Sequence, residues 1–327
     1  NGGILVTRPT TGEILAMVGS LDYFASPSGA FNVTTAQRQP GSSIKPLMYS
    51  LALERGYTAG TIIDDSAITF ASAGGESYRP VNYDGRFHGK IPLRYALANS
   101  YNIPAVKVLS TVGVGNFVVH AQKMGISTWN DSSRFGLSLT LGGGEVTMVD
   151  MATAFSVFVN QGFRQELTGS IKIENQVGDS IFTARPSRTK VLNDGIAYII
   201  SDILADNVAR GWAFGTNSSL EIPGYNKKDN WTIGYTPNFL TAVWVGNNDG
   251  TPMNPYLTSG ITGAAPIWNR VMAYVLKNYS GGKARFEKPE NVVEKKCYFG
   301  RTEYFIKGTE NSVSCQAPTE TPAPPGY

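Results

Sequence analysis

Two pairs of predicted β-strands, one near the start of the sequence and one near its end, constrain the fold more than any other feature. Near the start, Ile4–Arg8 and Glu13–Val18 are two short strands joined by a Pro-Thr-Thr-Gly turn, which indicates a hairpin. Far along the chain, Trp231–Tyr235 and Leu240–Asn247 form another strand pair around a Thr-Pro-Asn-Phe turn. This pattern predicts one sheet made from distant parts of the chain, with helices inserted between.

The block between these strands is mostly helical. Apolar residues recur at helical spacing after Lys45 and again around Leu93 and Leu97. Further helices are expected at Gly115–Met124, Val146–Gln161, Ile196–Val208 and Ala265–Leu276. Alternating polarity over Ile171–Phe182 predicts a second hairpin within the block. The sequence therefore predicts an α/β (α+β) fold, an antiparallel sheet flanked by helices with an inserted helical subdomain.

The composition is that of a soluble globular protein. A chain of 327 residues can bury a large core, as one big domain or two modest ones. The net charge is only +3, so we expect no nucleic-acid partner. No apolar run approaches the roughly 20 residues of a membrane span. Because no signal peptide opens the sequence, we expect an excised piece of a longer protein or a mature form.

Cysteine and histidine are scarce. An even pair, Cys297 and Cys315, suits a small disulfide in an oxidising compartment, and two free surface thiols are the alternative. Two histidines, His88 and His120, are too few for a histidine metal cluster. A Ser-His-Asp triad stays open, although neither histidine has a suggestive neighbourhood. We expect no metal and no cofactor.

Three other patterns are interpreted as structural. The pair Asp64 and Asp65 indicates an exposed turn rather than a metal site. The run Leu141–Gly144 lacks a following lysine and serine or threonine, so it is not a phosphate-binding loop. Beyond Gly281 the composition shifts, and the Pro- and Thr-rich stretch Ala317–Tyr327 reads as a disordered linker or tail.

A candidate nucleophile lies where the polar stretch before the first helix ends. Ser42 is followed three residues later by Lys45, Gly41 precedes it, and a helical pattern follows. At the mouth of that helix, Ser42 and Lys45 would lie about one turn apart on the same face. A neutral lysine there could take the serine proton. The alternative is an ordinary helix N-cap, because Ser-x-x-Lys is a short pattern.

A second polar group interrupts the helical block at Ser100, Tyr101 and Asn102, just before Pro104 starts another helix. Such a break is often only a capped turn. It is also where a second serine and an amide could project into a cleft.

The two patterns occur in the order found in penicillin-recognising enzymes, and the surrounding sequence resembles the transpeptidase domain of class A (bifunctional) penicillin-binding proteins. The segments that carry the resemblance are QPGSSIKPLMY, RPVNYDGRFHG, LRYALANSYNIPAV, GLSLTLGGGEVTMVDMATAF and WTIGYTPNFLTAVWVGNNDG. The resemblance covers Gly3 to Leu276. It implies the penicillin-binding transpeptidase or serine β-lactamase-like fold. We expect this domain at residues 1–286 and a C-terminal extension with a disulfide at residues 287–327.

The resemblance implies a D,D-transpeptidase that acts on peptidoglycan stem peptides ending in D-Ala-D-Ala. By that reading Ser42 attacks the carbonyl, Lys45 takes its proton, and Ser100 relays a proton to the leaving amine. Asn102 would hold the substrate amide and orient Lys45, and Tyr101 would bind substrate. A β-lactam antibiotic would enter as a mimic and stop at the acyl stage. The family also implies a membrane tether, a preceding glycosyltransferase domain, and work at the extracellular face of the bacterial cytoplasmic membrane.

The sequence departs from the family at a third motif. The family carries Lys-Thr-Gly on the strand that lines the cleft, and this sequence has none. The likeness resumes on both sides as though a segment of roughly ten residues were missing between Asn226 and Lys227. Either the molecule contains a segment that the sequence skips, or the deletion is real and the enzyme is impaired. We favour the first, because deleting a central strand should leave a sheet with unpaired edges. Lys227 and Lys228 are read as solvated loop charges.

Two rival functions follow. A D,D-carboxypeptidase or β-lactamase-like hydrolase would use water in place of the acceptor amine, and water needs its own general base, which the motifs do not supply clearly. A binding or scaffold module with a dead site is the alternative from another class, and the absent third motif is the reason to consider it.

Overall fold

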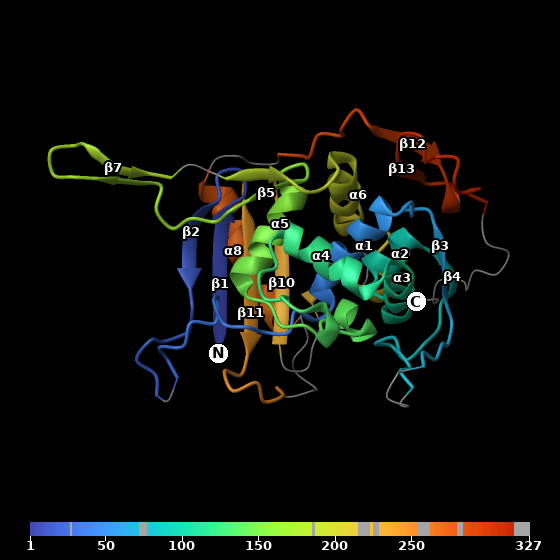
Figure 1. The fold of residues 1–327 in the computed structure, drawn as a ribbon, viewed down its shortest axis with the longest axis horizontal. Helices are drawn as coiled ribbons and strands as arrows, with labels where there is room; N and C mark the ends of the chain where they lie inside the picture. The colour runs from blue at the N-terminus through green and yellow to red at the C-terminus, as the bar shows by residue number, and fades with distance from the viewer. Residues whose placement is uncertain are drawn as a thin grey trace.

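The structure is a computed structural model, and it places a sheet at one end of the molecule and a group of helices at the other (Figure 1). It describes residues 1–26, 28–71, 77–184, 187–214, 223–224, 229–253, 262–279 and 284–316.

A five-stranded antiparallel sheet joins the two halves of the chain. Its strand order is β2 (Glu13–Val18), β1 (Gly2–Arg8), β11 (Leu240–Gly246), β10 (Asp229–Tyr235) and β9 (Pro223–Gly224). β1 pairs with β11 in a register that sets Leu5 opposite Ala242. β10 pairs with β11 in a register that sets Trp231 opposite Trp244. The predicted sheet from distant parts of the chain is confirmed.

One helix covers each face of this sheet, because side chains alternate between the two faces along each strand. On one face Val6 and Val243 pack with the buried side of α8 (Ala264–Asn278), including Trp268. On the other face Leu5 and Ala242 belong to the main core, to which α5 (Met148–Val159) contributes its apolar side. Thr147 and Asp150 form a capping box that fixes where α5 begins.

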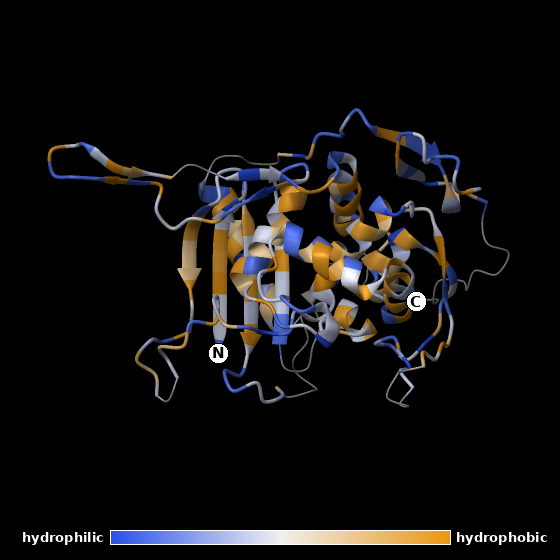
Figure 2. Cartoon of the chain, viewed as in Figure 1, coloured by the Kyte–Doolittle hydropathy of each residue, from blue (hydrophilic) through white to orange (hydrophobic). Residues whose placement is uncertain are grey.

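The remaining helices gather around α1, whose residues are all buried except the last. Apolar side chains on every side of a helix are typical of a position inside a core. Figure 2 shows the hydrophobic residues concentrated on these helices and on the sheet, with mostly hydrophilic loops. The group comprises α1 (Lys45–Glu54), α2 (Leu93–Ala98), α3 (Asn102–Val112), α4 (Val114–Met124), α6 (Asp194–Ala205), α7 (Gly211–Phe214) and the 3-10 turns η1 (Gly41–Ile44), η2 (Ser132–Arg134) and η3 (Leu137–Leu141).

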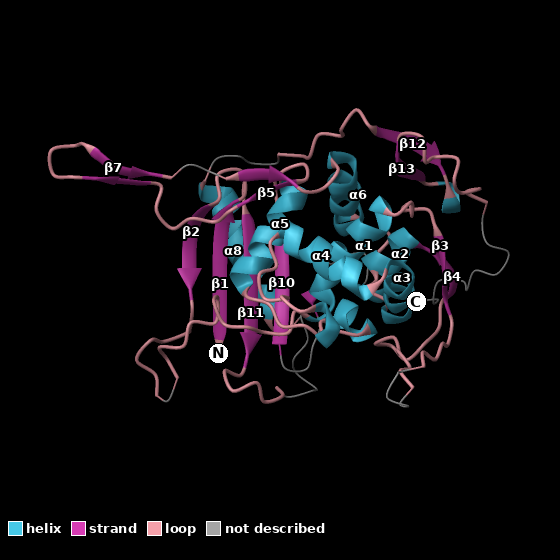
Figure 3. Cartoon of the chain, viewed as in Figure 1, coloured by secondary structure: helices cyan, strands magenta, loops and turns pink. Residues whose placement is uncertain are grey.

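Three small two-stranded sheets lie outside the five-stranded sheet and the helices (Figure 3). They are β3 (Ile62–Asp65) with β4 (Gly89–Pro92), β5 (Phe163–Gln165) with β8 (Arg188–Lys190), and β6 (Lys172–Glu174) with β7 (Ser180–Thr183). The β6–β7 hairpin is the one predicted from the alternation, and it projects from the body with exposed side chains on both faces.

The prediction that Asp64 and Asp65 form an exposed turn is wrong, because both lie on a strand and only Asp64 is exposed. Both residues lie on β3, and neighbouring residues of a strand point to opposite sides. Asp64 is exposed, whereas Asp65 is fully buried and accepts hydrogen bonds from Asn82 and His88.

The C-terminal part is a two-stranded unit packed on the helical group. β12 (Val292–Lys296) pairs with β13 (Thr302–Ile306) around η4 (Tyr298–Gly300), and a disulfide joins Cys297 to Cys315. Glu303 accepts two hydrogen bonds from the buried Arg94 guanidinium, which also pairs with Asp202 and Asp206. The predicted tail at 317–327 lies outside the described residues.

Candidate active site

Ser42 and Lys45 stand at the junction of η1 and α1, as the spacing predicts. Ser42 belongs to η1, and its carbonyl oxygen accepts the backbone N–H of Lys45, the first residue of α1. Pro46 follows in the first helical turn, where its missing N–H leaves no intrahelical bond unmade. Ser42 is 8% exposed and Lys45 is 1% exposed. The local geometry therefore holds the two side chains at the mouth of a buried helix.

The residues before Ser42 are held in place by hydrogen bonds to the sheet and to the segment around Val146. Trp231 on β10 donates its indole N–H to the carbonyl of Gln39 at 2.9 Å. Arg38 and Val146 exchange two backbone hydrogen bonds in an isolated bridge. The α-carbon of Gly142, after η3, lies so close to Gly41 that an added Cβ would meet the Gly41 nitrogen at 2.2 Å. A glycine is required at position 142, and η1 is held by backbone contacts on two sides.

The Lys45 ammonium group is surrounded by acceptors from the loop between α2 and α3. Its Nζ donates to the Ser100 carbonyl at 2.5 Å and to the Tyr101 carbonyl at 3.3 Å. It also lies 3.2 Å from Ser100 Oγ and 2.8 Å from Asn102 Oδ1. The two patterns that are more than 50 residues apart in the sequence thus meet at one amine.

Ser100 adopts a backbone conformation that most residues avoid. Its φ is +56°, in the left-handed region, where a side chain that is not glycine is uncommon. This turn ends α2 and aims the Ser100 carbonyl and hydroxyl toward Lys45, while Tyr101 caps α3 in an extended conformation. Strained residues of this kind persist where the surroundings over-determine them, and they cluster at functional sites.

Burial sets the electrostatics of the site. Loss of hydration lowers the pKa of Lys45 to about 7, and the negative charge of Asp65 opposes this by raising it. A lysine with such a pKa is neutral in about half of the molecules near neutral pH and can accept a proton. The side-chain hydroxyl of Ser42 makes no hydrogen bond within the described part of the chain. Active-site hydrogen bonds often form only when substrate is bound.

Tyr101 lies at the site by its backbone, and its side chain is buried. The phenol ring is 5% exposed and stacks on the His88 ring with 3.9 Å between the ring centroids. Burial, aided by the charges of Asp84 and Asp65, raises the pKa of the Tyr101 phenol. That Tyr101 binds substrate stays a prediction.

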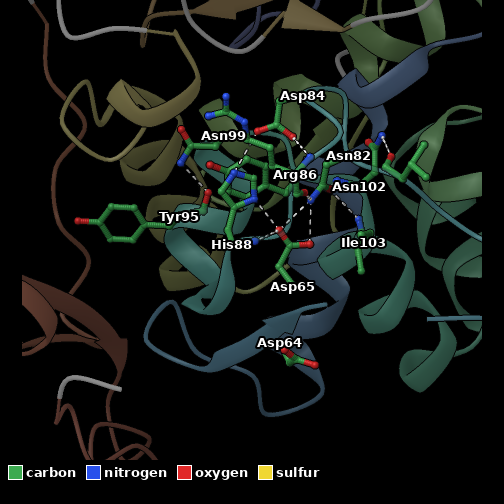
Figure 4. A network of polar contacts seen from close by, with 12 residues as sticks. Asp64, Asp65, Asn82, Asp84, Arg86, His88, Tyr95, Asn99, Asn102 and Ile103 are labelled. Carbon is green, nitrogen blue, oxygen red and sulfur yellow. Dashed lines mark hydrogen bonds and ion pairs between the residues drawn. The ribbon is translucent and has the colours of Figure 1, made fainter. Parts of the chain in front are cut away.

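Sequence reasoning missed the residues that support Asn102, and it found no role for either histidine. Asp65, Asn82 and His88 form a hydrogen-bonded network behind Asn102 (Figure 4). Two of them lie in the segment RPVNYDGRFHG, which carries the family resemblance, and this was the available signal.

His120 lies 2.8 Å from the Ser50 hydroxyl and 3.3 Å from a Glu54 carboxylate oxygen. This resembles a catalytic triad in its contacts, but Ser50 is fully buried and His120 is 4% exposed. The group therefore joins α1 to α4 inside the core, where no substrate reaches it.

A short strand lies at the sheet edge beside the site, next in the sequence to the position of the absent third motif. β9, Pro223–Gly224, pairs with Trp231 and Thr232 of β10 and contacts η1. The expectation of a central strand before Trp231 is wrong, because β9, which pairs with β10 there, is at the end of the strand order among the described residues. An edge strand can be shortened without unpairing a neighbour on its far side, so that argument for a skipped segment loses its force. Asn226, Lys227 and Lys228 lie outside the described residues.

The described part of the chain offers neither a metal cluster nor a single membrane-spanning helix. Across the described ranges, no three His, Cys, Asp or Glu side chains are placed where they could hold a metal ion. In the same ranges no single helix is long and apolar enough to cross a membrane. The consecutive helices α3 and α4 are long and apolar enough only when taken together, and they are bent by 96° relative to each other.

The fold, the meeting of Lys45 with Ser100 and Asn102, and the place of Ser42 one turn before Lys45 define a class of protein, and comparison with known families agrees. A model described as the penicillin binding protein transpeptidase domain matches residues 2–273. The chain belongs to this family.

Among named relatives, the chain is 33% identical over 321 residues to penicillin-binding protein 1A of Neisseria lactamica, covering 94% of this chain and 39% of that protein. It is 32% identical over 333 residues to penicillin-binding protein 1A of Aquifex aeolicus, covering 96% and 44%. The chain thus spans less than half the length of these relatives.

A solved structure gives the same picture of the fold. The crystal structure of penicillin-binding protein 1A from Haemophilus influenzae superposes with a TM-score of 0.83 at 26% identity, covering 95% of this chain and 54% of that chain. A Mycobacterium tuberculosis protein solved in complex with penicillin V has a TM-score of 0.72 at 22% identity, over 88% and 80%, and supports the fold alone. The predicted fold class is confirmed.

Proposed function

We propose that this chain is a serine D,D-transpeptidase that cross-links peptidoglycan stem peptides and is acylated by β-lactams. The observation that carries the proposal is the buried Lys45, whose pKa is lowered to about 7 and whose Nζ is within hydrogen-bonding distance of Ser100 and Asn102. Ser42 precedes it by one helical turn. A nucleophile, a base and a second hydroxyl in this arrangement are suited to acyl transfer.

The proposed reaction has two stages. Ser42 Oγ attacks the carbonyl of the D-Ala-D-Ala bond and its proton passes to neutral Lys45. The C–N bond then breaks, and a proton returned through Ser100 leaves with the amine of the terminal D-alanine. In the second stage the amine of another stem peptide attacks the ester and gives a proton to neutral Lys45. The C–O bond to Ser42 then breaks, Lys45 returns the proton to Ser42 Oγ, and the cross-link is formed. Asn102 accepts a hydrogen bond from Lys45 through Oδ1, so it orients the base, and we propose that it also contacts the substrate amide.

The same proposal fixes the expected partners and place of work. They are peptidoglycan stem peptides and β-lactam antibiotics, at the extracellular face of the bacterial cytoplasmic membrane. A membrane tether and a glycosyltransferase domain belong to the longer parent protein. We further propose a transpeptidase domain at 1–286 and a separate extension at 287–327.

The absent Lys-Thr-Gly motif bears on the rate rather than on the identity of the nucleophile. In the family that strand supplies an oxyanion-hole N–H, and loss of one such donor costs about two to three orders of magnitude in rate. The mass of a proteolytic peptide that spans Pro223 to Trp231 distinguishes the two interpretations. A peptide heavier than the printed residues means that the segment exists, and agreement with them means that the deletion is real.

The test is to incubate the protein with a donor peptide ending in D-Ala-D-Ala and an excess of an acceptor amine. We expect released D-alanine together with the aminolysis product, and neither from Ser42→Ala. The matched control is Ser43→Ala, because the neighbouring hydroxyl donates to the Pro40 carbonyl. Hydrolysis product alone would favour a carboxypeptidase. A folded protein that releases no D-alanine would favour a binding module with a dead site.

A further inference from the structure

A buried carboxylate that the proposed reaction does not use lies behind the Ser100–Asn102 loop. Asp65 is fully buried at the end of β3. Its two oxygens accept hydrogen bonds from Asn82 Nδ2 at 2.9 and 2.8 Å, from the His88 backbone N–H at 3.0 Å, and from His88 Nδ1 at 2.6 Å. Burying a charge is costly unless it is paired and hydrogen-bonded. Among the described residues, the groups that donate to Asp65 belong to Asn82 and His88.

The side-chain oxygen of Asn82 extends this contact to the active-site loop. Asn82 Oδ1 accepts the backbone N–H of Asn102 at 2.8 Å and that of Ile103 at 3.2 Å. These are the first residues of α3, whose N–H groups have no partner within the helix. Asn102 also donates from Nδ2 to the Val81 carbonyl, which leaves Oδ1 to face Lys45.

His88 closes the network from the solvent side. Its Nε2 lies 3.1 Å from an Asp84 carboxylate oxygen, so the ring stands between two carboxylates. The ring face stacks on Tyr101, whose backbone carbonyl is one of the acceptors of Lys45. Figure 4 shows Asp65 at the centre of these side chains, with Asn82 between it and Asn102.

We propose that Asp65, Asn82 and His88 are positioning residues that hold the Ser100–Asn102 loop against Lys45. The three residues touch no reacting atom and act through Asn102 and Tyr101. This inference rests on the proposed function, since it assigns the support of the same base. It explains why a charged group is buried at β3 and why Asn102 presents an oxygen rather than its amide nitrogen to Lys45.

The network also affects the pKa of Lys45, and this effect distinguishes a positioning role of Asp65 from a role in stability alone. The charge of Asp65 raises the pKa of Lys45 against the effect of burial. Tyr49, one turn further along α1, and Tyr101 have pKa values that burial raises, so both phenols are neutral in this range. Removing the charge of Asp65 therefore moves the pH at which Lys45 loses its proton to a lower value.

The experiment compares Asp65→Asn with Asp64→Asn, because these neighbours on β3 are the same residue type with opposite exposure. Asp64 is exposed and pairs with Lys107. The rate of acylation by a chromogenic penicillin is measured from pH 5 to 9. We expect Asp65→Asn to slow acylation about 10- to 100-fold, the loss typical of a displaced catalytic group, and to lower the midpoint of its pH profile. Asp64→Asn should keep both the rate and the midpoint.

A double variant, Asp65→Asn with Asn82→Asp, tests whether hydrogen-bond pairing is the cause. In it the amide at position 65 donates to the carboxylate at position 82, which still accepts from Asn102 and Ile103. We expect it to recover most of the lost rate and to return the midpoint toward that of the unaltered protein. Two results would overturn the inference: an Asp65→Asn variant with unchanged rate and midpoint, or a loss of rate with an unmoved midpoint and no recovery in the double variant.

Amide hydrogen exchange provides a readout that does not need acylation. We expect faster exchange at the Asn102 and Ile103 amides in Asp65→Asn and in Asn82→Ala, with no change in Asp64→Asn. If Asp65→Asn does not fold, Asn82→Ala carries the test through the same exchange rates and the acylation rate. If the unaltered protein forms no adduct, the proposed function fails. The network is then judged by exchange alone, and unchanged exchange in the variants would refute it.

Discussion

Replacement of Gly142 by alanine should destabilise the protein and displace the backbone next to Ser42. Gly142 has φ +89°, and an added Cβ would meet the Gly41 nitrogen at 2.2 Å and its α-carbon at 2.4 Å. The left-handed conformation costs a residue with a Cβ about 1–2 kcal/mol. Overpacking against fixed atoms adds about 1–3 kcal/mol. We therefore expect Gly142→Ala to lower the free energy of unfolding by about 2–5 kcal/mol.

The control for the conformational part is Gly56→Ala, at φ +93° with nothing within 4 Å of the added Cβ. It should lose only about 1–2 kcal/mol. Because the atoms that must move belong to Gly41, next to Ser42, Gly142→Ala should also slow β-lactam acylation, whereas Gly56→Ala should not. Urea unfolding and a stopped-flow acylation assay measure the two effects. Equal losses of stability in the two variants, with equal acylation rates, would refute the packing argument.

Three further outcomes follow from the structure. The acylation rate of the unaltered protein should rise with pH through a midpoint near 7, because deprotonation of Lys45 creates the base; a flat profile from pH 5 to 9 would contradict this. Arg94→Met should lower the free energy of unfolding by about 3–5 kcal/mol in urea titration, because it leaves the buried Glu303 carboxylate without its cation. Replacing both Cys297 and Cys315 by serine should cost about 3 kcal/mol, given a sequence separation of 18 residues; no loss in non-reducing urea would contradict this.

The parts of the fold that local patterns encode could be predicted. The hairpin β1–β2, the pair β10–β11 and the helices α4, α5, α6 and α8 lie within a few residues of their expected positions, because their periodicity and turns are local. That Lys45 lies close to Ser100 and Asn102 could be predicted only from the family resemblance. Spacing alone left two interpretations of Ser42 open, a nucleophile or a helix N-cap, since both have the same sequence.

The failures concern residues whose environment is set by distant partners. Asp65 looks like its neighbour Asp64 in the sequence, and its burial depends on Asn82 and His88, which lie 17 and 23 residues away. No local pattern shows which side of a short strand faces the core. The position of β9 at the sheet edge was missed for a similar reason, because strand order is a property of the whole sheet.

The most direct test of the central claim, that Ser42 is an acylated nucleophile activated by Lys45, is intact-protein mass spectrometry with a β-lactam, followed by peptide mapping. We predict one adduct per molecule, located on Ser42 and absent from Ser42→Ala, with Ser43→Ala still labelled. Adduct formation should be strongly slowed in Lys45→Met. An adduct on another residue, or none in the folded protein, would contradict the account.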